Sequence, residues 1–153
     1  MKALHGPVAP LLVFAWGNRS RGDDALGPLF LDRLRPLLPA DLSVELLEDY
    51  QLQIEHALDL AGRSSVLFVD ASLTCGAPFE VTEPAAARDA SVATHTLSVS
   101  ALLQVYCDLH SHAPPPATLL AIRGERFELG ASLSPAAAAH LELAIHWYRH
   151  WRS

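Results

Sequence analysis

The chain has 153 residues, of which 50% are hydrophobic and 18% are charged, and its formal net charge is −6. These values are typical of a folded globular protein and exclude a disordered one, and we expect a single domain over residues 1–153. The negative charge argues against a nucleic-acid partner, because phosphate binding needs clustered Lys and Arg, and the 11 such residues are scattered along the chain.

The first half of the sequence alternates between predicted strands and helices. Continuous apolar residues predict strands over residues 11–16 and 65–71, of the kind that is buried on both faces. Alternating polar and apolar residues predict a strand over 42–47. Helical spacing predicts a helix over 26–38, ended by Pro39, and a short helix over 53–61, closed by Gly62.

The second half continues the alternation. A strand is predicted to begin at 79–81 and to extend toward Pro84, followed by an irregular segment over 85–93. A helix over 98–110, a strand over 117–122 and a final helix from 135 to about 151, capped by Ser134, complete the pattern. Strands that alternate with helices form βαβ units, so the predicted fold class is α/β. We expect a single three-layer α/β/α sandwich with a mostly parallel, about five-stranded twisted sheet.

The compartment is predicted from cysteines and apolar runs. Cys75 and Cys107 are too few for a disulfide framework and form no CxxC pair, which fits a reducing environment. Gly6, Pro7 and Pro10 interrupt the apolar run that a signal peptide needs, and no later run is long enough to span a membrane. We therefore expect a cytoplasmic protein with no membrane partner.

Three places in the sequence follow predicted strands, where α/β sheets form their binding sites. They are the pair Asp23 and Asp24 in the loop after the first strand, Asp70 at the end of the third strand, and His95 before the helix at 98–110. A carboxylate that ends a buried strand must be hydrogen-bonded, paired or bound to metal. Asp70 could therefore also cap a helix or hold a loop.

The loop over residues 17–27 (GNRSRGDDALG) has glycines but not the chemistry of a phosphate site. It lacks the Gly-Lys-Ser/Thr of a P-loop, and its glycine spacing does not match a dinucleotide fingerprint. One acid at the helix start would be explained by the helix dipole, and the second would not. The two loop carboxylates, together with Asp70 and an imidazole, would suit a divalent transition metal. The residues alone suggest such a site but do not decide it.

Other reactive side chains are weaker candidates. Cys75 follows a strand but is a lone loop cysteine, and Cys107 falls on an amphipathic helix. His56 lies on the predicted short helix and could face the cleft. His146 and His150 are spaced i, i+4 on the last helix, where no acid is placed to complete a metal site. No serine lies in a GxSxG elbow.

These residues together resemble the [NiFe] hydrogenase maturation endopeptidases. The family's opening loop is matched by Gly17-Asn18, Asp23-Asp24 and Gly27, its acid after the third strand by Asp70-Ala71, and its later landmarks by Thr94-His95, Leu102-Leu103 and the run IRGERFELGASLSP. The match spans about residues 11–145. The run DYQLQIEHALDL is similar to the branch that serves cytoplasmic NAD-linked bidirectional hydrogenases. The sequence departs from the family at Ser20, often Leu, and at Ala25, often Gly.

The resemblance implies an endopeptidase that removes the C-terminal extension of the hydrogenase large-subunit precursor after nickel insertion. It implies that Asp24, Asp70 and His95 contact nickel supplied by the substrate, and that Asp23 orients the loop or caps the helix. We expect a monomer whose partner is that precursor. Three alternatives stay open: a non-enzymatic nickel-binding assembly factor, a small nucleotide-binding α/β domain, and a thiol hydrolase that uses Cys75.

Overall fold

The computed structural model describes residues 8–88 and 97–152. Within them, five strands form one sheet in the order β2-β1-β3-β5-β4. The strands are β1 (Leu11–Trp16), β2 (Val44–Asp49), β3 (Ser65–Ser72), β4 (Phe79–Thr82) and β5 (Ala117–Arg123). Strands β2, β1, β3 and β5 run parallel to one another, and β4 pairs antiparallel with β5. The predicted α/β fold with a mostly parallel sheet is confirmed.

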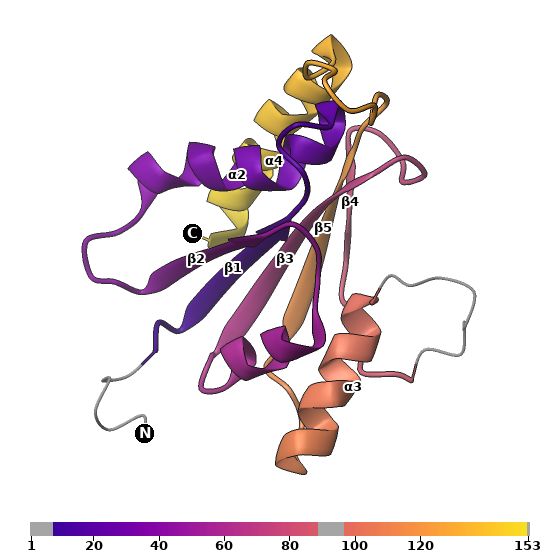
Figure 1. Ribbon diagram of the computed structural model, residues 1–153. Helices are drawn as coiled ribbons and strands as arrows, with labels where there is room; N and C mark the ends of the chain where they lie inside the picture. The colour runs from indigo at the N-terminus through magenta and orange to yellow at the C-terminus, as the bar shows by residue number, and fades with distance from the viewer. Residues whose placement is uncertain (1–7, 89–96, 153) are drawn as a thin grey trace.

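Helices cover both faces of this sheet (Figure 1), which makes the three layers. The α-helices are α2 (Leu26–Leu34), α3 (Val99–His110) and α4 (Pro135–Arg152), and the 3-10 helices are η1 (Gly22–Ala25), η2 (Arg35–Leu37) and η3 (Ile54–Leu60). One core packs α2 and α4 on the sheet, and the other packs α3 and η3 on the opposite face. Among the helices that the structure describes, none is both long and apolar enough to cross a membrane.

Strand β1 contributes to both cores because successive side chains of a strand point to opposite faces. Leu11 and Val13 belong to the core under α2 and α4, whereas Leu12 and Phe14 belong to the core under α3. All four side chains are at most 2% exposed. The continuous apolar run over 11–16 is therefore the signature of a central strand, as the sequence predicts.

Two predicted elements have different limits in the structure. The predicted strand 42–47 begins two residues later, because Leu42 is in a left-handed conformation (φ 60°) and is 80% exposed. The N–H of Ser43 donates to the carboxylate of Asp41, which forms a turn in place of the strand start. The predicted helix 26–38 ends as an α-helix at Leu34 and continues as η2, which contains Pro36, a residue without an N–H.

The other elements differ by less. The helix predicted over 53–61 is the 3-10 helix η3, and the strand predicted to extend toward Pro84 is the short edge strand β4. Ser98 and Ser134 cap α3 and α4: Ser98 Oγ accepts from the N–H of Ala101, and Ser134 Oγ accepts from that of Ala137. The predicted cap at Ser134 is confirmed.

The strand order places a binding crevice at one position. The chain passes from β1 through α2 to β2 on one side of β1, and then returns to β3 on its other side. At such a switch in strand order, the loops at the carboxyl ends of the two strands diverge and leave a crevice between them. By that rule the expected crevice lies between the loop after β1 and the end of β3.

Candidate functional site

The loop between β1 and α2 is held by its own backbone. The amides of Arg21 and Asp24 donate to Asn18 and Arg21, and the amide of Gly17 donates to Asp49 at the end of β2. The amide of Ser20 donates to the Asn18 side chain. Since these N–H groups have partners inside the protein, they are not arranged to cradle a phosphate, which argues against the nucleotide-binding alternative.

Two glycines let this loop approach the strand ends. Gly17 has φ +148°, and a Cβ on it would lie 2.0 Å from the carbonyl oxygen of Asp24. A Cβ on Gly27 would lie 2.6 Å from the carbonyl oxygen of Trp16 and 3.1 Å from that of Val69. The first turn of α2 therefore packs directly on the ends of β1 and β3. This packing brings Asp24 close enough to Asp70 for its charge to act on that carboxyl.

Asp23 is fully buried, at 0% exposure, and its carboxylate accepts four hydrogen bonds. The donors are the backbone amides of Glu125, Arg126 and Ser134, at 2.7, 3.1 and 2.7 Å, and the hydroxyl of Ser134 at 2.7 Å. Burial raises the pKa of Asp23, but these hydrogen bonds together outweigh burial and hold the pKa below its ordinary value.

Asp23 thus joins the loop after β1 to the start of α4. Its four hydrogen bonds come from Glu125, Arg126 and Ser134, which lie far from its own helix in sequence. It binds the amide and hydroxyl of Ser134, the N-cap of α4. Its predicted role in orienting the loop agrees with this geometry.

Asp24, the second acid, is half-buried and points back into its own loop. Its Oδ2 accepts a hydrogen bond of 2.8 Å from the backbone amide of Asn18. One carboxylate oxygen is therefore held while the group keeps further lone pairs for a ligand.

Asp70 lies on β3, two residues before the strand ends. Burial is the main reason that its pKa is raised, to about 7, and the negative charge of Asp24 raises it further. Hydrogen bonds from the Ala71 backbone and the Trp16 side chain act in the opposite direction. A carboxyl that titrates near neutral pH and is coupled to a second carboxyl marks a candidate functional site. Asp24 and Asp70, distant in sequence, are thus brought together.

The third predicted ligand, His95, and its neighbour Thr94 lie outside the described residues. Over residues 8–88 and 97–152, no cluster of three or more His, Cys, Asp or Glu side chains could hold a metal ion. The assignment of Asp24, Asp70 and His95 as nickel ligands stays a prediction.

His56, the weaker candidate, is buried at 6% exposure and is bonded through both ring nitrogens. Its Nδ1 accepts from the amide of Gln53 at 2.8 Å, so in the neutral ring Nε2 carries the proton and donates to Asp49 at 2.9 Å. The ring also packs edge-on against Phe14. His56 therefore fixes the end of β2. The spacing of Gln53 and His56 matches a capping box, and this is the sequence signal that could have predicted a structural role for His56.

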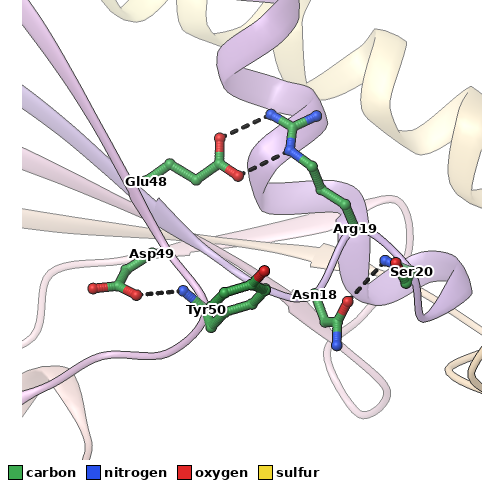
Figure 2. A pocket seen from close by; sticks show the side chains of 7 residues that line it. Asn18, Arg19, Ser20, Glu48, Asp49 and Tyr50 are labelled. Atoms are coloured by element: carbon green, nitrogen blue, oxygen red, sulfur yellow. Dashed lines mark hydrogen bonds and ion pairs between the residues drawn. The ribbon is translucent and has the colours of Figure 1, made fainter.

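A pocket of about 280 Å³ opens beside this site, lined by residues 17–20 of the loop and 48–50 at the end of β2. Figure 2 shows Arg19 joined to Glu48 at this pocket, which the side chains of Asn18 and Tyr50 also line. The pocket is contiguous with the candidate site, because Asn18 both lines it and binds Asp24. Sequence reasoning missed Arg19 and Glu48, which carry no motif.

The remaining reactive side chains do not assemble a second site. Cys75 is buried at 7% exposure, and its thiol donates to the carbonyl of Ala121 at 3.5 Å, which argues against a thiol nucleophile. The rings of His146 and His150 lie 4.4 Å apart on α4. They belong to no cluster of three or more possible metal ligands among the described residues.

Comparison with known proteins identifies the fold. No protein-family model matches the chain, and no curated protein matches its sequence. Solved structures do match. The hydrogenase maturating endopeptidase HybD from Escherichia coli is 23% identical with a TM-score of 0.71, over 90% of this chain and 88% of that chain. The [NiFe] hydrogenase maturation protease HycI from Thermococcus kodakarensis KOD1 is 20% identical with a TM-score of 0.72, over 96% and 94%.

A third structure gives the same result. The hydrogenase 2 maturation peptidase from Thaumarchaeota archaeon SCGC_AB-539-E09 is 20% identical with a TM-score of 0.64, over 94% of this chain and 97% of that chain. In all three comparisons the structural similarity covers nearly the whole of both chains. At these low sequence identities, the similarity shows a shared fold. This chain therefore has the fold of the [NiFe] hydrogenase maturation proteases.

Proposed function

We propose that this chain is an endopeptidase that removes the C-terminal extension of a [NiFe] hydrogenase large-subunit precursor after nickel insertion. The observation that carries the proposal is the pair Asp24 and Asp70, two coupled carboxyls in the crevice at the switch in strand order. The fold that presents them is shared with proteins described as hydrogenase maturation endopeptidases and proteases.

The pair fits a cation that the substrate brings. The pKa of Asp70 is raised chiefly by burial and further by the negative charge of Asp24. A divalent ion between them would relieve this repulsion, and a mixed set of carboxylates and imidazole suits nickel. We propose Asp24 and Asp70, with His95 as a third ligand, as the groups that contact nickel in the precursor.

The same residues offer a route to hydrolysis. With a pKa of about 7 in the metal-free protein, Asp70 can accept a proton from water near neutral pH, as a general base must. Asp24, held by the Asn18 amide, would keep its position beside it. A water activated by the substrate's nickel is the other route, in which the carboxylates serve as ligands.

The proposed partner is the large-subunit precursor of a cytoplasmic NAD-linked bidirectional hydrogenase. This finer assignment is supported only by the run DYQLQIEHALDL over residues 49–60. Processing of that precursor in preference to one from another hydrogenase class would test it.

The test is intact-mass analysis of purified protein mixed with precursor, with and without nickel. We expect loss of the C-terminal extension only from nickel-loaded precursor, and we expect the single variants Asp24→Asn, Asp70→Asn and His95→Ala to abolish it. Asp108→Asn is a matched control, because Asp108 pairs with Arg88 on the exposed surface of α3. Processing by all three variants at the wild-type rate would show that the site is wrong. Binding of the precursor without any change in mass would favour the assembly factor.

A further inference from the structure

Arg19 lies between two carboxylates, each of which it binds through two hydrogen bonds. Its Nε and Nη2 donate to Glu48 at 2.9 and 2.8 Å, and its Nη1 and Nη2 donate to Asp32 at 2.7 and 2.9 Å. The planar guanidinium therefore has a defined orientation relative to both partners.

These carboxylates belong to two separate elements. Glu48 is near the end of β2, and Asp32 is on α2. Single exposed ion pairs contribute little to stability, and the Arg19 side chain is 42% exposed. An arginine that binds two carboxylates bidentately is the exception, because its geometry restrains the backbone that carries it.

The restraint reaches the candidate site along the backbone, through the peptide between Asn18 and Arg19 and then through Asn18 itself. Asn18 immediately precedes Arg19, and its amide donates to Asp24 Oδ2 at 2.8 Å. The amide of Ser20, on the other side of Arg19, donates to Asn18 Oδ1 at 2.8 Å. Arg19 therefore lies in the short segment, residues 18–20, whose backbone binds one oxygen of Asp24 and whose turn is closed by the Ser20 amide.

We propose that Arg19 is a positioning residue, which holds the Asn18 amide on Asp24 by binding Asp32 and Glu48. The expected effect of Arg19 on turnover rests on the proposed function. Arg19 itself would not touch the scissile bond. A residue that only stabilised the fold would affect the free energy of unfolding without a selective effect on Asn18 or on turnover.

The experiment compares Arg19→Gln with Arg33→Gln. Arg33 is a matched control, because it binds Glu142 through both of its terminal nitrogens with a similar exposure of 46%, between α2 and α4. The first measurement is hydrogen exchange of the Asn18 amide by NMR on the metal-free protein. We expect exchange to accelerate about tenfold or more in Arg19→Gln and to be unchanged in Arg33→Gln.

The second measurement is turnover of nickel-loaded precursor. We expect kcat to fall roughly 10- to 100-fold in Arg19→Gln, as misplacement of a reacting group does, with little change in Arg33→Gln. Arg19→Lys should recover only part of the loss, because an ammonium cannot bind two carboxylates bidentately.

The outcomes separate the two proposals. Equal exchange of the Asn18 amide in Arg19→Gln and Arg33→Gln would overturn the positioning role, and so would faster exchange with unchanged kcat. If wild-type protein cleaves no precursor, the proposed function fails. Faster exchange at Asn18 in Arg19→Gln alone would then still support the positioning of Asp24 by Arg19.

Discussion

Asp24 comes from η1, in the loop after β1, and Asp70 from β3, and the charge of Asp24 adds to burial in raising the pKa of Asp70 to about 7. The approach depends on the packing of α2 on the ends of β1 and β3, where Gly27 leaves room for the carbonyls of Trp16 and Val69. The two carboxyls therefore act as a coupled pair, and their coupling can be measured without substrate.

The first prediction concerns that coupling. In metal-free protein, Asp24→Asn should lower the pKa of Asp70, because the substitution removes the like charge that disfavours ionisation. The Asp70 pKa should stay above its ordinary value, since burial is the larger cause. Carboxyl carbon shifts followed by NMR across pH 4–9 would measure it. An Asp70 pKa that is the same in Asp24→Asn and in wild type would show that the carboxyls do not interact.

The second prediction concerns pH and stability. Folding raises the pKa of Asp70, so between about pH 4 and pH 7 the native state holds a proton that the unfolded state has lost. The stability from this group is present below the unfolded pKa and falls as pH rises toward 7. Asp70→Asn should therefore become progressively more stable than wild type over this range, by roughly 1.4 kcal/mol per unit of pKa shift.

Urea unfolding of metal-free protein at pH 4.5, 6 and 8 would measure this difference. Asp108→Asn is the control, because the exposed Arg88 partner lowers the pKa of Asp108, so the difference between this variant and wild type should stay nearly constant over the same pH range. A difference between Asp70→Asn and wild type that does not grow with pH would contradict the prediction.

The third prediction concerns Asp23. Asp23→Ala should lower the free energy of unfolding by roughly 3 kcal/mol or more, because it leaves the amides of Glu125 and Ser134 without their buried acceptor. Folding lowers the pKa of Asp23, so its stabilisation is present above the unfolded pKa and is lost as pH falls through the lower folded pKa.

For Asp23, urea unfolding at pH 7 and pH 3 gives the measurement. Asp23→Asn should lose stability at pH 7 and approach wild type in acid. Asp41→Asn serves as the control, since Asp41 is exposed and bonds only within its own turn to Ser43. If Asp23→Ala destabilises no more than Asp41→Asn, the buried network is not what joins the loop to α4.

The fourth prediction concerns Gly17. Gly17→Ala should destabilise the fold and disturb the loop, because the new Cβ would lie 2.0 Å from the Asp24 carbonyl oxygen at φ +148°. Gly130→Ala is a matched control: Gly130 also has a positive φ, +85°, but a Cβ there would meet nothing within 4 Å. We expect the free energy of unfolding to fall by about 1 kcal/mol in Gly130→Ala and by roughly 1–3 kcal/mol more in Gly17→Ala. Thermal or urea unfolding would measure both losses. Equal losses would mean that no steric contact forms.

Much of the fold follows from the sequence because its signals are local. The apolar run of β1, the helical spacing of α3 and the cap at Ser134 each depend on residues within a few positions of one another. The start of β2 does not, because the turn at Asp41 and Ser43 overrides an alternating pattern that begins at Leu42, two residues before the strand. The family resemblance gives the acids a proposed role but does not say which groups they bind within the fold.

The sequence by itself determined that strands and helices alternate and that acids follow the strands, since burial patterns and loop composition are written in consecutive residues. Only the tertiary structure decided what each acid does. Asp23 is held by Ser134 and Asp24 by Asn18, and the pKa of Asp70 is raised by burial and by the charge of Asp24. The physical reason is that hydrogen bonds and charge coupling depend on distances in space, which strand order and the close approach of α2 to the sheet set.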